Sequence, residues 1–153
     1  MTNFLYRFAA QLIFERPISR KTVGELMERL QKNGEQLHSR FAQLPENDYN
    51  RRVLSHIIGI ERWGQRRLAV LLGESLLLDE YDSYRPAREV PVAELAQLFA
   101  ETRHKTLEIA HELEQSKKKF SKVPHNQYGE LTVRGWLNYL NVHAMGESYK
   151  VKK

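Results

Sequence analysis

Two residues near the C-terminus have the chemical types and the spacing of metal ligands. His143 and Glu147 lie four positions apart in residues 132–151, where apolar residues recur every three or four positions. That period predicts a helix with one buried face. On this helix Glu147 falls near the centre of the apolar stripe, and His143 lies one turn earlier at its edge. Their Cβ atoms would be about 5–6 Å apart, so both side chains can converge on one ion.

A carboxylate inside an apolar stripe requires a compensating partner, because burying a charge is costly. A metal ion between His143 and Glu147 would supply that compensation. A salt-bridged or hydrogen-bonded His143–Glu147 pair inside a helix bundle would supply it equally well. The spacing alone leaves both interpretations open.

The composition indicates one globular domain spanning residues 1–153. Hydrophobic residues make up 41% of the 153 residues and charged residues 28%, which is typical of a folded chain. Cysteine is absent, which excludes disulfides, zinc ribbons and a thiol nucleophile, so a metal would need histidine and carboxylate ligands. The net charge of +5 comes with no basic stripe interleaved with aromatics, and nucleic-acid binding is therefore not indicated.

The apolar run at residues 4–14 is too short to span a bilayer and is interrupted by Arg7 and Gln11. It lacks the basic region and cleavage site of a secretory signal, so we expect a cytoplasmic protein with no membrane partner. The run has more apolar surface than a short leading segment usually exposes, so it should pack on the domain or on a partner. We therefore predict a homodimer.

Four helical patterns, and no convincing strand, predict an all-α fold. The helices are expected at residues 19–44, 49–72, 91–115 and 132–151, after an N-terminal extension of residues 1–18. Thr22 and Glu25 have capping-box spacing, Gly73 suits a helix end, and Pro91 suits a helix start. Residues 74–90 form a long connection between helices two and three, and residues 120–131 are expected as a loop. This is the pattern of a four-helix bundle.

The histidines differ in their expected positions. His104 and His111 are predicted to be exposed, and His38 is predicted to lie at the boundary between the surface and the core. His56 flanks the inner face of the second helix, and His125 lies in the loop before the fourth. A single histidine at the edge of an apolar stripe is usually a hydrogen-bonded boundary residue, so spacing alone does not assign His56 to a site.

Two segments resemble a known family. Residues 54–63, LSHIIGIERW, are similar to the second helix of the DinB-like metal-dependent superfamily. Residues 125–147, HNQYGELTVRGWLNYLNVHAMGE, resemble its last loop and helix. The similarity extends over residues 19–151. It implies a four-helix bundle that holds one metal ion with a histidine on the second helix and an H-x-x-x-H pair on the last.

Carried over by position, this resemblance assigns the first ligand to His56 and the second to His143. The third position holds Glu147 where the family has histidine. Two histidines and one carboxylate are still a recognised ligand set for zinc and for non-haem iron. The implied cofactor is a divalent ion, with zinc, nickel and iron as candidates.

The resemblance also implies a metal-dependent transferase or hydrolase acting on a small molecule, with a low-molecular-weight thiol as a possible second cofactor. Five residues are candidates for contacts with the substrate or with the ligands: His125, Tyr128, Tyr139, Trp63 and Trp136. The alternative is a metal-free homodimeric binding module without catalytic activity. DNA binding, which the family name suggests, has no support in the charge pattern.

Overall fold

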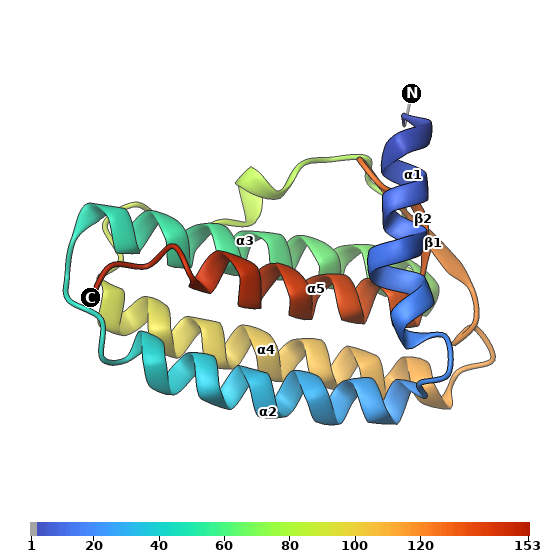
Figure 1. The fold of residues 1–153 in the computed structure, drawn as a ribbon, viewed down its shortest axis with the longest axis horizontal. Coiled ribbons are helices and arrows are strands. Elements are labelled where there is room, and N and C mark those ends of the chain that lie inside the picture. The colour runs from blue at the N-terminus through green and yellow to red at the C-terminus, as the bar shows by residue number, and fades with distance from the viewer. Residues whose placement is uncertain (1–2) are drawn as a thin grey trace.

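The computed structural model describes residues 3–153 and is mostly helical, as the sequence predicts. Four long helices lie side by side, and a short N-terminal helix crosses one end of them (Figure 1). The helices are α1 (Phe4–Ala10), α2 (Val23–Phe41), α3 (Asp48–Leu68), α4 (Val92–Gln115) and α5 (Val133–Ser148). No helix within residues 3–153 is long and apolar enough to cross a membrane. The cytoplasmic location stays a prediction.

Local capping explains where the long helices begin. Thr22 and Glu25 form the predicted capping box, in which the Glu25 N–H donates to Thr22 Oγ1 at 3.1 Å and the Thr22 N–H to Glu25 Oε2 at 2.8 Å. Asn47 and Thr132 cap α3 and α5 through their side chains alone, which accept from the N–H groups of Asn50 and Gly135. After α3 the chain tightens into a 3₁₀ turn, η3 (Ala69–Leu72), and ends at Gly73 with φ of 107°.

The expectation of a loop at residues 120–131 is wrong, so the fold is predominantly rather than purely α-helical. Strands β1 (Lys122–His125) and β2 (Gly129–Thr132) form an antiparallel hairpin. Each strand has only four residues, so the alternation of buried and exposed positions is too short to stand out in the sequence. Val123 and Leu131 are fully buried and pair with each other across the hairpin.

The N-terminal segment divides into a packed part and an exposed part. After α1 come a π-helical turn, η1 (Gln11–Glu15), and a 3₁₀ turn, η2 (Arg16–Ile18). The Glu15 carboxylate accepts hydrogen bonds from the Thr132 N–H and Oγ1, both at 2.8 Å, which holds η1 at the start of α5. Phe4, Leu5 and Phe8 on α1 remain 77%, 68% and 56% exposed, so only part of the run packs on the domain.

The long connection, residues 73–91, is a crossover segment that returns along α3. Helices α3 and α4 run in the same direction, so the chain must travel back along their length before α4 begins (Figure 1). Midway it forms a 3₁₀ turn, η4 (Tyr81–Tyr84). Gly59 permits close contact with α3, because a Cβ there would lie 2.6 Å from Arg85 Cγ. The crossover segment is therefore ordered against α3.

A buried ion pair joins three of the long helices. Glu61 on α3 accepts from Arg103 on α4 through two contacts, Nε–Oε1 at 2.6 Å and Nη2–Oε2 at 3.0 Å. The third Arg103 nitrogen, Nη1, donates to the Leu30 carbonyl on α2 at 2.9 Å. Both side chains are almost fully buried. Such a pair fixes helix positions, because breaking it would leave an unpaired charge in the core.

Helices α3 and α5 approach closely at Gly64. A Cβ at this position would lie 2.6 Å from Leu140 Cδ2 and 3.0 Å from Leu140 Cδ1. Leu140 itself is buried, with 1% of its surface exposed. The absence of a side chain at Gly64 therefore sets the distance between the two helices.

We expect Gly64→Val to destabilise the fold by about 1–3 kcal/mol, because Leu140 has little room to move away from the added methyl groups. Gly146→Val is the matched control, since nothing lies within 4 Å of a Cβ at Gly146 on the same helix as Leu140. The control should change stability by less than about 0.5 kcal/mol. Urea denaturation of both variants measures the difference, and equal midpoints would contradict this account of the α3–α5 contact.

Candidate metal centre

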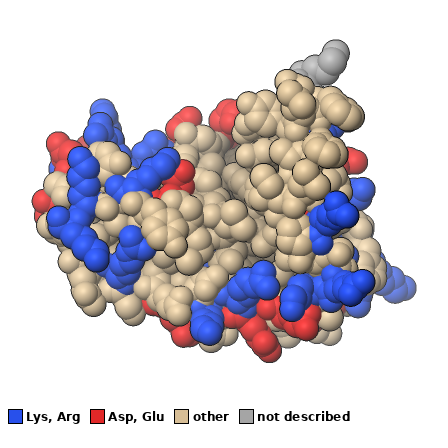
Figure 2. Space-filling view, in the orientation of Figure 1, with Lys and Arg blue, Asp and Glu red and all other residues tan. Residues whose placement is uncertain are grey.

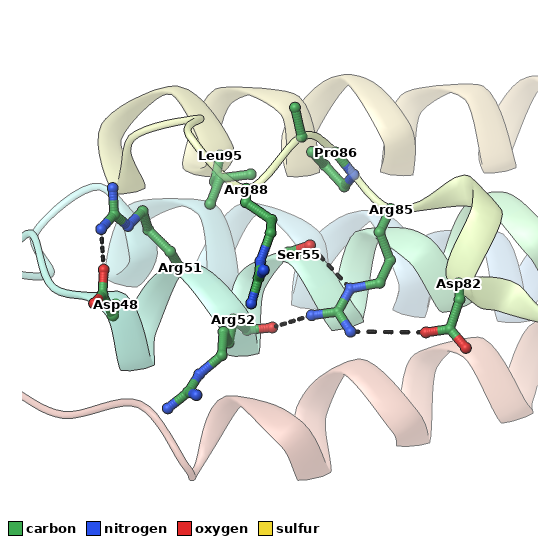
Figure 3. Close-up of a pocket in the computed structure, with 10 residues that line it drawn as sticks. Asp48, Arg51, Arg52, Ser55, Asp82, Arg85, Pro86, Arg88 and Leu95 are labelled. Atoms are coloured by element: carbon green, nitrogen blue, oxygen red, sulfur yellow. Dashed lines mark hydrogen bonds and ion pairs between the residues drawn. The ribbon is translucent and has the colours of Figure 1, made fainter.

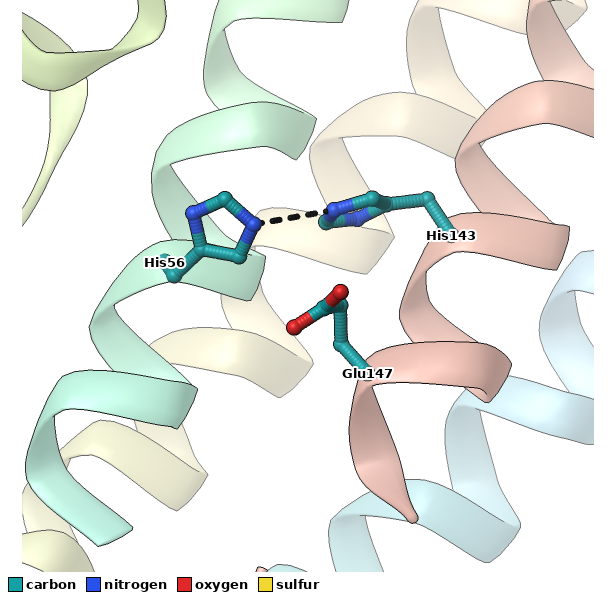
Figure 4. Close-up of side chains that lie close together, drawn as sticks. All are labelled: His56, His143 and Glu147. Carbon is teal, nitrogen blue, oxygen red and sulfur yellow. Dashed lines mark hydrogen bonds between the residues drawn. The ribbon is translucent and has the colours of Figure 1, made fainter. Parts of the chain in front are cut away.

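The three predicted ligands meet between α3 and α5. His56 extends from α3, and His143 and Glu147 extend from successive turns of α5 toward it (Figure 4). One potential ligand atom from each residue lies within 4.8 Å of the other two. The two histidine Nε2 atoms are 3.1 Å apart. The structure thus brings together three donor groups that are up to 91 positions apart in the chain.

The electrostatics of the site favour neutral imidazoles. Burial, and then the neighbouring His56, lower the pKa of His143 to about 4. Burial also lowers the pKa of His56, where the opposing attraction of Glu147 is followed by repulsion from Arg85. Both rings are therefore unprotonated near pH 7, which is the form that binds a metal.

Glu147 is less buried than the helical projection predicts. Its side chain is 21% exposed, and Oε1 accepts a 2.9 Å hydrogen bond from Lys150 Nζ. Burial would raise its pKa, but the Lys150 hydrogen bond and the two imidazoles outweigh burial and lower it. The difference arises because α5 ends at Ser148, so Glu147 lies at the open end of the stripe. A charged carboxylate is thus maintained without a metal.

The donor set fits a divalent ion. Two nitrogen ligands of a tetrahedral zinc ion, each about 2.0–2.1 Å from the metal, are themselves about 3.3 Å apart. The observed 3.1 Å between Nε2 atoms is close to that separation. At this distance one imidazole donates its proton to the other, and a cation could replace that shared proton. Within residues 3–153 no hydrogen bond joins His143 to Glu147, so these two have other partners.

Two tyrosines border the cluster. The Tyr81 ring, from η4 of the crossover segment, stands edge-on to His56 with ring centroids 4.9 Å apart. The Tyr139 ring lies on α5 one turn before His143, with centroids 6.0 Å apart. Tyr139 was predicted from the sequence, whereas Tyr81 was not. The sequence signals for a role of this segment were the length of the connection and its tyrosines.

The other predicted supporting residues gather in an aromatic cluster on the hairpin side of Tyr139. His125 lies at its centre, within 5.2 Å, between ring centroids, of Trp63, Trp136, Tyr128 and Tyr139. Trp63 and Trp136 are buried and donate to the carbonyls of Asp79 and Val123. They belong to the core, and only Tyr139 of the five contacts the ring of a candidate ligand.

Comparison of this chain with family models, curated proteins and solved structures finds no match. The geometry of its own residues must therefore support any assignment of function.

His125 should make the protein acid-sensitive. Burial, followed by the charges of Arg67 and His143, lowers its pKa to about 3, against about 6.5 in an unfolded chain. Between these values the unfolded state binds more protons, so stability falls as pH drops below about 6.5. This residue alone should contribute a slope of up to about 1.4 kcal/mol per pH unit.

The matched variant is His125→Asn, because an asparagine oxygen can accept the backbone N–H groups of Gln127 and Tyr128 that now donate to Nδ1. Urea denaturation at pH 7 to 4 in chelator should show a shallower pH dependence for this variant. His111→Asn, on the exposed face of α4, should retain the wild-type slope. Identical slopes for His125→Asn and wild type would contradict the prediction.

Proposed function

We propose that this protein is a metal-dependent enzyme whose divalent ion is held by His56, His143 and Glu147. The observation that carries the proposal is that three ligand atoms lie within 4.8 Å of one another, although they come from two helices that are far apart in the chain. Two neutral imidazoles and one carboxylate are a set that zinc, nickel or iron accepts. Three protein ligands leave at least one coordination position open for water or substrate.

The reaction class that we propose is transfer or hydrolysis on a small molecule. A metal bound here would lower the pKa of a coordinated water toward 7, or would stabilise the thiolate of a low-molecular-weight thiol. The chain's own contribution is to hold the three ligands and to border them with Tyr81 and Tyr139. The substrate would enter beside the crossover segment, which supplies Tyr81.

We further infer that the four long helices form a four-helix bundle of the DinB-like kind. In support, two residues of the resembling segments, His56 on α3 and His143 on α5, lie opposite each other with their Nε2 atoms 3.1 Å apart. The long connection between α3 and α4 also has the expected place. Glu147 is the one ligand position at which this chain departs from the family's pattern.

A metal-free homodimeric binding module is the second candidate. One observation favours it: in the structure, His56 pairs with His143 and Glu147 pairs with Lys150, so each group has a partner without a metal. The exposed apolar face of α1 would then be the surface that binds a partner. The two candidates differ in metal content and in their response to substitutions at the cluster.

We expect wild-type protein, expressed without a histidine tag, to retain about one divalent ion per chain after dialysis against a weak chelator. His143→Ala should lose it, because a nitrogen ligand is removed from a three-residue set. Glu147→His should keep it, since a histidine supplies a third ligand at the same helical spacing, whereas Glu147→Leu should not. Elemental analysis of each variant measures the metal content.

The matched control is His111→Ala, which removes an exposed histidine of α4 and should leave the metal content unchanged. Urea denaturation with chelator and with added zinc gives a second measure. Zinc should raise the midpoint of wild type and of Glu147→His, but not that of Glu147→Leu. An equal zinc-induced shift in wild type and Glu147→Leu would rule out Glu147 as a ligand.

We also propose that α1 mediates a homodimer. On the side of the molecule that carries α1, the upper surface shows few charged residues (Figure 2). Phe4, Leu5 and Phe8 are the most exposed of its apolar residues, and a contiguous apolar surface of this kind usually marks an interface.

Light scattering at micromolar concentration should give about twice the 18.0 kDa chain mass. The double variant Phe4→Lys/Phe8→Lys should be monomeric, because it places charges on the proposed interface. Phe120→Lys, which replaces a 70% exposed phenylalanine elsewhere, should remain dimeric. A monomeric wild type at this concentration would reject the proposal.

A further inference from the structure

A cavity lined by arginines lies at the start of α3, next to the candidate metal centre. Its volume is about 620 Å³, within the range of small-molecule sites. Four of its lining residues are arginines, two on α3 and two on the crossover segment (Figure 3): Arg51, Arg52, Arg85 and Arg88. The acidic residues that line it are Asp48 and Asp82. The wall therefore has an excess of positive charge.

The arginines differ in how far their charge is already neutralised. Arg51 forms ion pairs with Glu46 and Asp48, so its positive charge is already neutralised. Arg85 donates mainly to neutral acceptors, Ser55 Oγ at 3.1 Å and the Arg52 carbonyl at 3.2 Å, and lies 3.8 Å from Asp82.

Arg52 and Arg88 have no side-chain hydrogen bond or ion pair within residues 3–153. Two of the four guanidinium groups are therefore available, and a third, that of Arg85, is held mainly by neutral acceptors. A planar guanidinium binds phosphate and carboxylate oxygens through paired hydrogen bonds. An anionic group is the ligand that this cavity would accept.

The cavity and the metal centre share their supporting elements. Arg52 precedes His56 by one turn of α3, so the two side chains lie on the same helical face. Ser55, which lines the cavity and holds Arg85, is the residue before His56. On the crossover segment, Tyr81 contacts His56 while the next residue, Asp82, lines the cavity. A molecule with an anionic group among the arginines would thus lie beside the cluster.

We propose that this cavity binds the phosphate or carboxylate group of the substrate whose reacting part lies at His56, His143 and Glu147. The inference rests on the proposed metal centre and names its substrate class: a small anionic molecule. The cavity is also expected to couple to the metal. Arg85 is held by Ser55, the residue before His56, so an anion that neutralises the positive charge of Arg85 should favour a cation at the cluster.

The first test measures the Kd for inorganic phosphate by equilibrium dialysis at constant ionic strength. It uses zinc-loaded protein and protein from which a chelator has removed zinc. Phosphate should bind both forms, because the arginines remain when zinc is removed. Arg52→Gln and Arg88→Gln should each raise the Kd about tenfold, the effect of one lost charge-assisted hydrogen bond. Arg29→Gln, an equal loss of charge at an exposed position of α2, should retain the wild-type Kd.

Succinate in competition with phosphate distinguishes the two anionic groups. Displacement of phosphate by succinate shows that carboxylates are accepted, and phosphate that is bound but not displaced restricts the class to phosphates. Failure of both anions to bind the wild type overturns the proposal. The same Kd for phosphate in wild type, Arg52→Gln and Arg88→Gln also overturns it.

The second test measures zinc affinity at fixed free zinc, with and without enough phosphate to saturate the wild type. Phosphate should raise the zinc affinity of wild type and of Arg29→Gln severalfold, and that of Arg88→Gln by clearly less, because weaker phosphate binding leaves part of this variant unoccupied. If phosphate raises the zinc affinity of Arg88→Gln as much as that of wild type, phosphate binds zinc directly. If phosphate does not raise the zinc affinity of wild type, the cavity is separate from the metal. Either result overturns the proposal. If the protein binds no zinc, the proposed metal centre itself is wrong. If it binds zinc but not phosphate, only the proposed anion cavity is wrong.

Discussion

The contact between α3 and α5 is the constraint on which the candidate centre depends. Gly64 lets the two helices approach until Leu140 fills the space that a side chain would occupy. The helices run in opposite directions (Figure 1), so moving from Gly64 back to His56 corresponds to moving from Leu140 forward to His143. A shift of α5 by one residue would rotate His143 by about 100° away from His56. The precision of the cluster is therefore set by apolar packing about two turns away along α3 and about one turn away along α5.

The second determinant is the parallel course of α3 and α4. Because these helices share a direction, their connection has to run back along α3, and this route brings Tyr81 to His56 and Arg85 to Ser55. A short connection between antiparallel helices would have left both regions open to solvent. The border of the cluster and the basic wall of the cavity therefore have the same topological origin.

Helical periodicity in the sequence was sufficient to predict the four long helices and to place His143 near the inner face of α5. The resemblance added His56, and the structure brings it to His143. The surroundings of Glu147 could not be predicted, since its contact with Lys150 depends on where α5 ends. Arg85 and Tyr81 were missed because the aperiodic crossover segment does not reveal which helix it will follow. The hairpin was missed because four-residue strands have too little alternation.

Arg67 connects three parts of the molecule that are distant in the chain. It is 1% exposed on α3, and it donates to the Asp79 carbonyl on the crossover segment, the Pro124 carbonyl on β1 and Asn126 Oδ1 in the hairpin turn. Local opening of the hairpin would therefore break the same hydrogen-bond set that holds the first half of the crossover segment. These two surface elements constitute one cooperative unit, with amide protons that should exchange with solvent together rather than independently. The second half of the crossover segment, beyond Asp79, lies outside these Arg67 contacts, so it can open without breaking them.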